Sequence, residues 1–271
     1  MVERPELILV LGGARSGKST FAEQLAAQRA AARAALSPAA GADSPPSGAG
    51  RVTYLATAQA FDDEMRQRIA RHQADRAQSW TTVEAPLTVP EAVRAHAATT
   101  DVFLLDCVTF WVTNLLFSAG GLGEQAPEGL GDFGREFIAP EVERAASRRV
   151  AAALDDLLAA LAETGAVMVA VANEVGLGLV PEYPLGRLYR DEQGRANHRL
   201  AAAATEAYLL VAGLPLDLKG LGSSSPTSPP PSASPPPPTA PPPPTAPQPP
   251  AASPPLPSSP FSPPPEEEPA P

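Results

Sequence analysis

Apolar residues in this chain fall into short continuous runs, separated by longer segments with helical periodicity. Because the runs do not alternate with polar residues, they are typical of strands buried on both faces of a parallel sheet. We expect strands or short extended segments at residues 6–11, 51–56, 80–84, 102–106, 166–172 and 207–212. We expect helices at 18–35, 62–76, 89–98, 110–118, 136–163 (one helix or a broken pair) and 187–205. This alternation predicts an α/β fold in which a mostly parallel sheet is flanked by helices.

The helix expected at 89–98 begins with a recognisable capping sequence. Thr88 stands at the N-cap position, Pro90 falls in the first turn, and Glu91 follows Thr88 by three residues. In such a capping box, each of the two side chains accepts a hydrogen bond from the backbone N–H of the other residue. We therefore expect both caps to form.

Composition divides the chain near Gly220. Residues 221–271 consist almost entirely of Pro, Ser, Thr and Ala, and they hold most of the 35 prolines. A segment with so few large apolar residues cannot offset the entropy lost on ordering, so we expect a disordered tail with polyproline II character. Residues 1–220 are enough for one α/β domain. A second low-complexity stretch, residues 37–50, is expected to be a surface-loop insertion in that domain.

Charge and cysteine content narrow the class of protein further. The net charge is −10, and only three acidic residues lie in the tail. An acidic domain without basic clusters argues against nucleic acid as the main partner. The single cysteine, Cys107, excludes an intrachain disulfide and a Cys-rich zinc site. The N-terminal apolar run is too short for a signal peptide, and no apolar stretch reaches the roughly 18 residues of a membrane span. We therefore expect a cytoplasmic protein.

The first apolar run is followed by a motif that points to a chemistry. Residues 12–19 satisfy the phosphate-binding pattern Gly-x4-Gly-Lys-[Ser/Thr] and are Gly12, Gly13, Ala14, Arg15, Ser16, Gly17, Lys18 and Ser19. In this pattern backbone N–H groups surround phosphate oxygens, the Lys reaches the β- and γ-phosphates, and the hydroxyl ligates Mg²⁺. The helix that follows adds the positive end of its dipole. The order strand, loop, helix predicts a P-loop NTPase (RecA-like) fold that binds a nucleoside triphosphate.

Two polar residues stand at the expected carboxyl ends of strands, where α/β proteins bind their ligands. Asp106 ends the run 102–106, and a carboxylate in this position holds the nucleotide's Mg²⁺ directly or through water. Its alternative role is the N-cap of the next helix. Thr57 follows the run 51–56, where its hydroxyl and the nearby amides would face the nucleotide.

Two further groups are less defined by pattern alone. His72 lies among arginines in the expected helix 62–76, and a neutral imidazole attacks phosphorus well, but a lone helical His is more often a surface residue. The stretch Asn-Glu-Val-Gly-Leu-Gly at 173–178 follows a buried strand and precedes a polar segment that contains Arg190 and Asn197. This region suits either a lid over a substrate or a solvated connection.

Taken together, these segments resemble the bifunctional adenosylcobinamide kinase / adenosylcobinamide-phosphate guanylyltransferases of cobalamin biosynthesis, the CobU/CobP family. The similar stretches are the phosphate loop, Tyr-Leu-Ala-Thr-Ala at 54–58, Asp-Asp-Glu-Met at 62–65 continuing to His72, Trp-Thr-Thr-Val-Glu at 80–84, Thr-Asn-Leu-Leu at 113–116 and Asn-Glu-Val-Gly at 173–176. They occur in family order over roughly residues 6–213. Many families share the phosphate loop, but the combination is specific.

The resemblance implies two activities on one domain. ATP or GTP phosphorylates adenosylcobinamide, and GMP from GTP then passes to adenosylcobinamide phosphate through a covalent histidine adduct. His72 stands at the family's histidine position. The resemblance also implies Mg²⁺ held by Ser19 and Asp106, a corrinoid substrate and a homo-oligomer, trimeric in the family. The implied nucleotide contacts are residues 12–19, Ala56, Thr57, Ala58, Gln73, Ala74, Asp75, Arg76, Glu84 and Asp106.

Two other functions remain open on the sequence. A monofunctional P-loop nucleotide kinase or ATPase would use the same loop, with His72 in a structural role. A nucleotide-gated interaction protein would instead bind a partner through its Pro-rich tail.

Overall fold

The protein folds around one seven-stranded sheet. The computed structural model describes residues 6–36, 50–59, 63, 66, 67, 79–118 and 138–221. Within them the strand order is β3-β2-β4-β5-β1-β6-β7, and every pair is parallel except the antiparallel pair β6 and β7. The strands are β1 Leu7–Gly12, β2 Val52–Ala56, β3 Thr81–Glu84, β4 Val102–Asp106, β5 Val167–Asn173, β6 Glu206–Val211 and β7 Leu214–Asp217. The predicted mostly parallel α/β sheet is confirmed.

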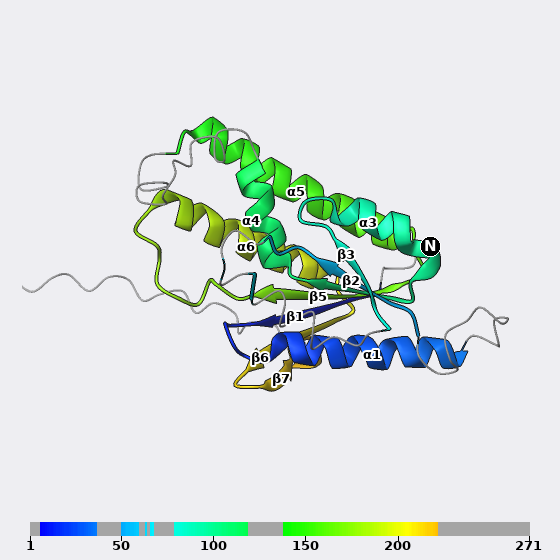
Figure 1. Ribbon diagram of the computed structural model, residues 1–271. Helices are drawn as coiled ribbons and strands as arrows, with labels where there is room; N and C mark the ends of the chain where they lie inside the picture. The colour runs from blue at the N-terminus through cyan, green and yellow to red at the C-terminus, as the bar shows by residue number, and fades with distance from the viewer. Residues whose placement is uncertain are drawn as a thin grey trace, which may run out of the picture. The chain divides into compact units, whose positions relative to one another are not determined.

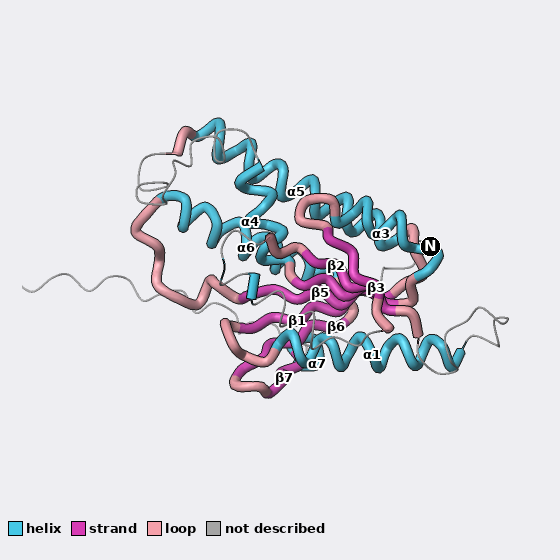
Figure 2. Tube along the Cα trace, in the orientation of Figure 1, coloured by secondary structure: helices cyan, strands magenta, loops and turns pink. Residues whose placement is uncertain are grey.

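Helices cover both faces of this sheet. They are α1 Lys18–Leu36, α3 Val89–His96 with the 3₁₀ turn η1 Ala97–Thr99, α4 Val108–Ser118, α5 Pro140–Ala162, α6 Pro184–Ala203 and the short α7 Leu218–Leu221. Figures 1 and 2 show α1 on one side of the sheet and α3, α4, α5 and α6 on the other. None of the helices in the described part of the chain is long and apolar enough to cross a membrane.

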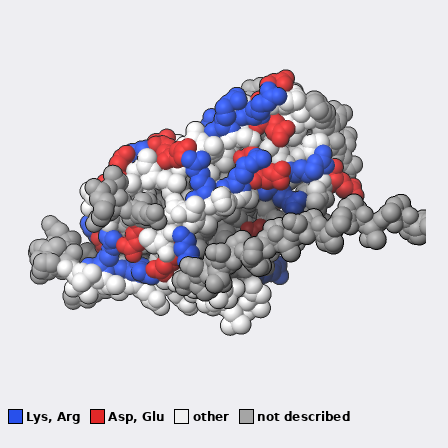
Figure 3. Space-filling view, turned by 180° about the vertical axis from the view of Figure 1, so that it is seen from behind, with Lys and Arg blue, Asp and Glu red and all other residues white. Residues whose placement is uncertain are grey.

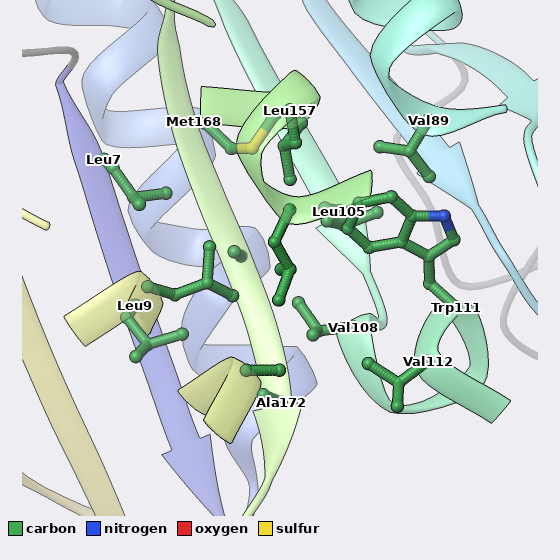
Figure 4. Packing of buried hydrophobic residues seen from close by; sticks show 14 of the residues in the cluster. Leu7, Leu9, Val89, Leu105, Val108, Trp111, Val112, Leu157, Met168 and Ala172 are labelled. Carbon is green, nitrogen blue, oxygen red and sulfur yellow. The ribbon is translucent and has the colours of Figure 1, made fainter. Parts of the chain in front are cut away.

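The core has two layers because successive strand residues point to opposite faces. In β1, Leu7 and Leu9 pack with residues of α4, α5 and α6, whereas Ile8 and Val10 pack with residues of α1. Figure 4 shows the first layer, in which Trp111 lies among aliphatic side chains. Its indole Nε1 donates a hydrogen bond to the Leu87 carbonyl oxygen at 3.1 Å. Burial on both faces is the reason that the strand sequences are continuously apolar.

The capping box expected at the start of α3 is not formed. The helix does begin at Val89, but neither Thr88 nor any other side chain caps its first turn. Thr88 has φ −102° and ψ 44°, and this is not the extended backbone from which an N-cap hydroxyl reaches the N–H groups of the first turn. The turn is stabilised instead by packing, since Val89, Pro90 and Val93 are buried.

Several helix boundaries also differ from expectation: α5 begins at Pro140 and not at 136, and α6 spans Pro184–Ala203 and not 187–205. Helix α4 begins at Val108, two residues earlier than predicted. The first hydrogen bond of this helix runs from the Trp111 N–H to the Cys107 carbonyl oxygen at 3.2 Å. The sequence analysis did not anticipate β7, because its four residues are all exposed and form no apolar run. The signal was Gly213, which with Ala212 forms a turn in which both residues have positive φ, the geometry of a two-residue hairpin.

Several expectations fall outside the described residues. They concern most of the insertion 37–50, the tail beyond Leu221 and most of the helix 62–76 that carries His72. Asp63, Arg66 and Gln67 are described in that segment and are helical, with an ion pair of 2.6 Å between Arg66 Nη2 and Asp63 Oδ1.

Candidate nucleotide site

The polar residues predicted for the site gather at one edge of the sheet. Parallel strands bring their carboxyl ends to the same edge, and Figure 1 shows the arrowheads of β1 and β5 side by side there. The register pairs Gly12 with Asn173, and it pairs Ala56 with both Asp106 and Glu84. The phosphate loop, the end of β4 and the end of β5 therefore share this edge, as the rule for ligand sites in α/β folds requires.

The phosphate loop joins β1 to α1 in a tightly turned conformation. Arg15 and Gly17 have φ values of 57° and 87°, and the Ser16 N–H donates to the Gly13 carbonyl oxygen at 3.4 Å. The Lys18 ammonium donates to the same oxygen at 3.0 Å, so its charge lies over the loop. A hydrogen bond of 3.0 Å from Gly213 N–H to the Ser16 carbonyl oxygen fastens the loop to the β6–β7 turn.

Gly12 permits this conformation because it has no Cβ. A Cβ at this position would overlap the Ser16 hydroxyl oxygen and would lie 3.0 Å from the Leu210 carbonyl oxygen. At Gly13, in contrast, an added Cβ would meet no atom within 4 Å. The first glycine is therefore needed for close packing, and the second faces open space.

The carboxylate of Asp106 is held in place by the side chain of Tyr54. The Tyr54 hydroxyl donates to Asp106 Oδ2 at 2.9 Å, which fixes the carboxylate and leaves Oδ1 facing another direction. Strand β5 lies between β4 and β1, so the chain axes at Asp106 and at the loop are roughly 10 Å apart, two strand spacings. No group of three or more His, Cys, Asp or Glu side chains that could hold a metal occurs in the described ranges. The hydroxyl of Ser19 and the carboxylate of Asp106 are the hard oxygen ligands that suit Mg²⁺ bound together with substrate phosphates.

The polar groups of Thr57 form hydrogen bonds within the protein. The residue is completely buried. Its hydroxyl donates to the Cys107 carbonyl oxygen at 2.7 Å and accepts from the Cys107 N–H at 2.8 Å. Asn114 Nδ2 donates to the Thr57 carbonyl oxygen at 2.9 Å. From its sequence position the Thr57 hydroxyl was expected to face the nucleotide. In the structure it bonds the Cys107 backbone and so joins β2 to the start of α4.

The other expected nucleotide contacts fall into two groups. Ala56 and Ala58 are half-buried beside Thr57, and Glu84 is exposed at the end of β3. The remaining contacts, Gln73, Ala74, Asp75 and Arg76, lie with His72 outside the described residues. Their contact with a nucleotide stays a prediction.

The segment after β5 is held by a polar network that involves α6. Asn197 Nδ2 donates to the Asn173 carbonyl oxygen at 3.0 Å and lies 3.4 Å from Glu174 Oε2. Glu174 Oε1 accepts from Gly176 N–H at 2.7 Å, and Arg190 donates to the Gly176 carbonyl oxygen at 3.0 Å. The sequence indicated this polar cluster but not the role of the buried Gln193, whose Nε2 donates a hydrogen bond to Asn197 Oδ1 at 2.8 Å. Beyond the network, Leu177, Leu179 and Val180 are strongly exposed.

Two groups near the edge are unsuited to nucleophilic chemistry at neutral pH. Burial raises the pKa of the Cys107 thiol to about 12, aided by the nearby charge of Asp106. Burial likewise raises the pKa of the Tyr189 phenol to about 12. Both side chains stay protonated, because the low-dielectric interior disfavours the anion.

A separate cavity of about 940 Å³ lies between α5 and α6. None of the predicted nucleotide contacts lines it. Two of its arginines form ion pairs, Arg195 with Glu192 and Arg199 with Asp155. On the face seen in Figure 3, basic and acidic side chains are likewise interspersed.

Known proteins resemble this chain over nearly all of the described sheet and its helices. A family model described as cobinamide kinase / cobinamide phosphate guanyltransferase matches residues 8–218. The chain is 41% identical over 217 residues to the bifunctional adenosylcobalamin biosynthesis protein CobU of Salmonella typhimurium (strain LT2), covering 79% of this chain and 99% of that protein. It is 39% identical over 213 residues to CobU of Escherichia coli (strain K12), with the same coverage. It is 37% identical over 212 residues to the bifunctional protein CobP of Pseudomonas aeruginosa, covering 78% of this chain and 96% of that protein.

Proposed function

The chain belongs to the cobinamide kinase / cobinamide phosphate guanyltransferase family and is an enzyme of cobalamin biosynthesis, and we propose that it works in two steps. The first step phosphorylates the aminopropanol hydroxyl of adenosylcobinamide with ATP or GTP. The second transfers GMP from GTP to the resulting phosphate. The observation that carries this proposal is the family match, which runs through the phosphate loop, Asp106 and the end of β5. We further propose that the enzyme is a cytoplasmic homotrimer.

The kinase step is carried by the phosphate loop. The backbone N–H groups of residues 12–19 surround the phosphate oxygens, and Lys18 interacts with the β- and γ-phosphates. Ser19 and Asp106 are the residues that would hold Mg²⁺, which when bound neutralises charge that develops on the phosphates. The substrate hydroxyl oxygen attacks the γ-phosphorus, and the nucleoside diphosphate leaves. The task of the chain is positioning and electrostatic stabilisation.

The transfer step divides one displacement into two. The neutral imidazole of His72 attacks the α-phosphorus of GTP, forming a P–N bond as pyrophosphate leaves. A phosphate oxygen of adenosylcobinamide phosphate then attacks the same phosphorus and breaks that bond, giving adenosylcobinamide-GDP and free His72. His72 lies outside the described residues, so the support for this role is its position in the sequence.

Labelled GTP tests the proposal directly. After incubation with Mg²⁺ and α-labelled GTP, the protein should carry one GMP on His72, and γ-labelled GTP should leave no label. A phosphoramidate is labile to acid, so mild acid should remove the label. His72→Ala should abolish labelling and guanylyl transfer while retaining at least part of the kinase activity. Matched variants His96→Ala and His198→Ala should keep the label. Label that persists in His72→Ala would disprove this assignment.

The same assays separate the alternative functions. A monofunctional nucleotide kinase would phosphorylate its substrate but never take up GMP. An interaction protein that depends on its Pro-rich tail would lose its function when residues 222–271 are removed. We expect this truncation to leave both activities and the melting temperature nearly unchanged, because the composition of the tail offers little apolar surface to bury.

A further inference from the structure

Asn173 ends β5, and its backbone is held from three directions. Its N–H donates to the Thr109 hydroxyl at 2.8 Å, and its carbonyl oxygen accepts from Asn197 Nδ2 at 3.0 Å. The N–H of the next residue, Glu174, donates to the Gly12 carbonyl oxygen at 3.2 Å. These partners belong to α4, to α6 and to the first residue of the phosphate loop. The position of Asn173 is therefore fixed relative to all three.

The side chain of the same residue is not satisfied. Asn173 Oδ1 is buried and has no hydrogen-bond partner among the described residues. Two buried asparagines nearby differ from the half-buried Asn173: Asn114 Nδ2 bonds the carbonyl oxygens of Thr57 and Pro86, and both amide atoms of Asn197 are bonded. A buried polar group without a partner destabilises a fold, and such groups concentrate where function requires them.

The location of this carboxamide indicates what its partner is. Asn173 pairs in register with Gly12, and β5 lies between the strand of the phosphate loop and the strand that ends at Asp106. The γ-phosphate of a bound nucleotide and the acceptor hydroxyl must meet between those two ends. On the proposed function, the carboxamide therefore lies next to the point of phosphoryl transfer, and its Oδ1 has no hydrogen-bond partner in the described part of the chain.

We propose that the Asn173 carboxamide contacts the acceptor hydroxyl and orients it towards the γ-phosphorus in the kinase step. This inference rests on the proposed function and names a further residue for it. The hydroxyl O–H donates to Oδ1, which directs an oxygen lone pair at phosphorus. The new P–O bond forms as the bond to the nucleoside diphosphate breaks, and the hydroxyl proton leaves to solvent. The amide stays neutral throughout, which is sufficient because a loose phosphoryl-transfer transition state needs an oriented nucleophile more than a strong base.

The proposal is tested with Asn173→Ala, measured for both kinase kinetics and stability. The kinase kcat should fall at least tenfold, and roughly 100-fold is typical for loss of one preorganised polar contact. The nucleotide Kd should stay within about twofold, and GMP labelling of the protein within about threefold, because neither uses the acceptor hydroxyl. The melting temperature without ligand should be equal to that of the wild type or up to about 4 °C higher, because an unsatisfied polar group has been removed.

Asn114→Ala is the matched control, because it removes a buried amide whose partners are in the protein. It should lower the melting temperature. Asn173→Leu, which keeps a side chain of similar size but has no acceptor for the hydroxyl, should lose kinase kcat in the same direction and keeps the test decisive if the Ala variant folds poorly. An unchanged kcat in a folded Asn173 variant would overturn the inference. So would a lowered melting temperature with parallel losses of kcat, nucleotide binding and labelling, since that pattern means a structural role. A wild-type protein that does not phosphorylate adenosylcobinamide would instead refute the proposed function.

Discussion

The Thr57 hydroxyl and the Cys107 backbone form a reciprocal pair of hydrogen bonds, in which Oγ1 donates to the carbonyl oxygen at 2.7 Å and accepts from the N–H at 2.8 Å. The two residues lie 50 positions apart in the sequence. Their pairing joins the ends of β2 and β4 next to Asp106, whose carbonyl oxygen also accepts from Thr57 N–H at 3.4 Å. One buried hydroxyl therefore supports the position of the carboxylate that we propose for Mg²⁺.

Replacing this hydroxyl should cost both stability and activity. Thr57→Val keeps the shape of the side chain but leaves the buried Cys107 N–H unsatisfied, while the Cys107 carbonyl oxygen keeps its bond from Trp111 N–H, so we expect a loss of about 1–3 kcal/mol in the free energy of unfolding. Thr57→Ser retains the hydroxyl and should recover most of that loss. Urea denaturation of the three proteins measures the difference. A Val variant as stable as the wild type would mean that water replaces the hydroxyl at no cost.

The two glycines at the start of the phosphate loop should respond differently to the same substitution. In Gly12→Ala the new methyl group overlaps Ser16 and approaches the Leu210 carbonyl oxygen, so the loop must shift, and nucleotide affinity should fall at least tenfold. Gly13→Ala is the matched control, because its methyl group meets open space. The melting temperature of this control should stay close to that of the wild type. Titration with nucleotide and thermal melting check both, and equal behaviour of the two variants would contradict the packing argument.

Lys18→Ala should remove the charge that we propose for catalysis and leave the fold intact. The ammonium contacts the loop carbonyl of Gly13, and no part of the apolar core depends on it. We expect a loss of nucleotide-dependent activity well beyond tenfold, which corresponds to more than about 1.4 kcal/mol in the barrier. Activity is compared with the circular dichroism and melting temperature of the same sample. A folded variant that retains a tenth or more of wild-type activity would rule out this role for Lys18.

A surface pair far from the site should make stability depend on pH. Hydrogen bonds from the Arg51 side chain, against a smaller opposing effect of burial, hold the pKa of Asp101 below its usual 3.8. A lowered carboxyl pKa contributes stability that is present above about pH 4 and is lost as the pH falls through the folded-state pKa. Because Arg51 is half-exposed, we expect Asp101→Asn to cost only about 1 kcal/mol at pH 7. The wild-type and variant curves should converge once the pH falls below the folded-state pKa of Asp101, and curves that stay parallel would refute the linkage.

The single cysteine offers a probe of the same region. Because Cys107 is buried and its pKa is raised to about 12, the native protein should react with iodoacetamide at pH 8 at least tenfold more slowly than the unfolded protein. Mass spectrometry of the alkylated chain measures the rates. In Thr57→Val the native-state rate should rise, because the backbone around Cys107 loses its two hydrogen bonds. Rapid alkylation of the native wild type would contradict the burial of this thiol.

Much of the framework follows from local sequence. The apolar runs identified the parallel strands because a strand covered on both faces must be apolar throughout. The spacing of residues 12–19 identified the phosphate loop because its backbone turns require glycine at fixed positions, and Gly12 and Gly17 do occupy them. Asp106 was identified because it ends an apolar strand, and the parallel strands of an α/β sheet bring their carboxyl ends to the same edge. In each case the identifying pattern lies within a few residues along the chain.

The tertiary structure alone decided which polar groups are satisfied. Thr57 and Asn173 look alike in the sequence, each a polar residue at the end of an apolar strand. The pattern placed Thr57 at the nucleotide and left the segment of Asn173 as either a lid over a substrate or a solvated connection. Folding brings Cys107 to the Thr57 hydroxyl and, among the residues that the structure describes, leaves Asn173 Oδ1 without a hydrogen-bond partner. The first therefore supports the site, and the second is the group that we propose for the acceptor hydroxyl. Thr88 makes the same point, because its capping sequence is intact but its backbone is turned away from the cap. Whether a side chain binds the protein or a ligand depends on distances between segments far apart in the chain, and those distances exist only once the core has packed.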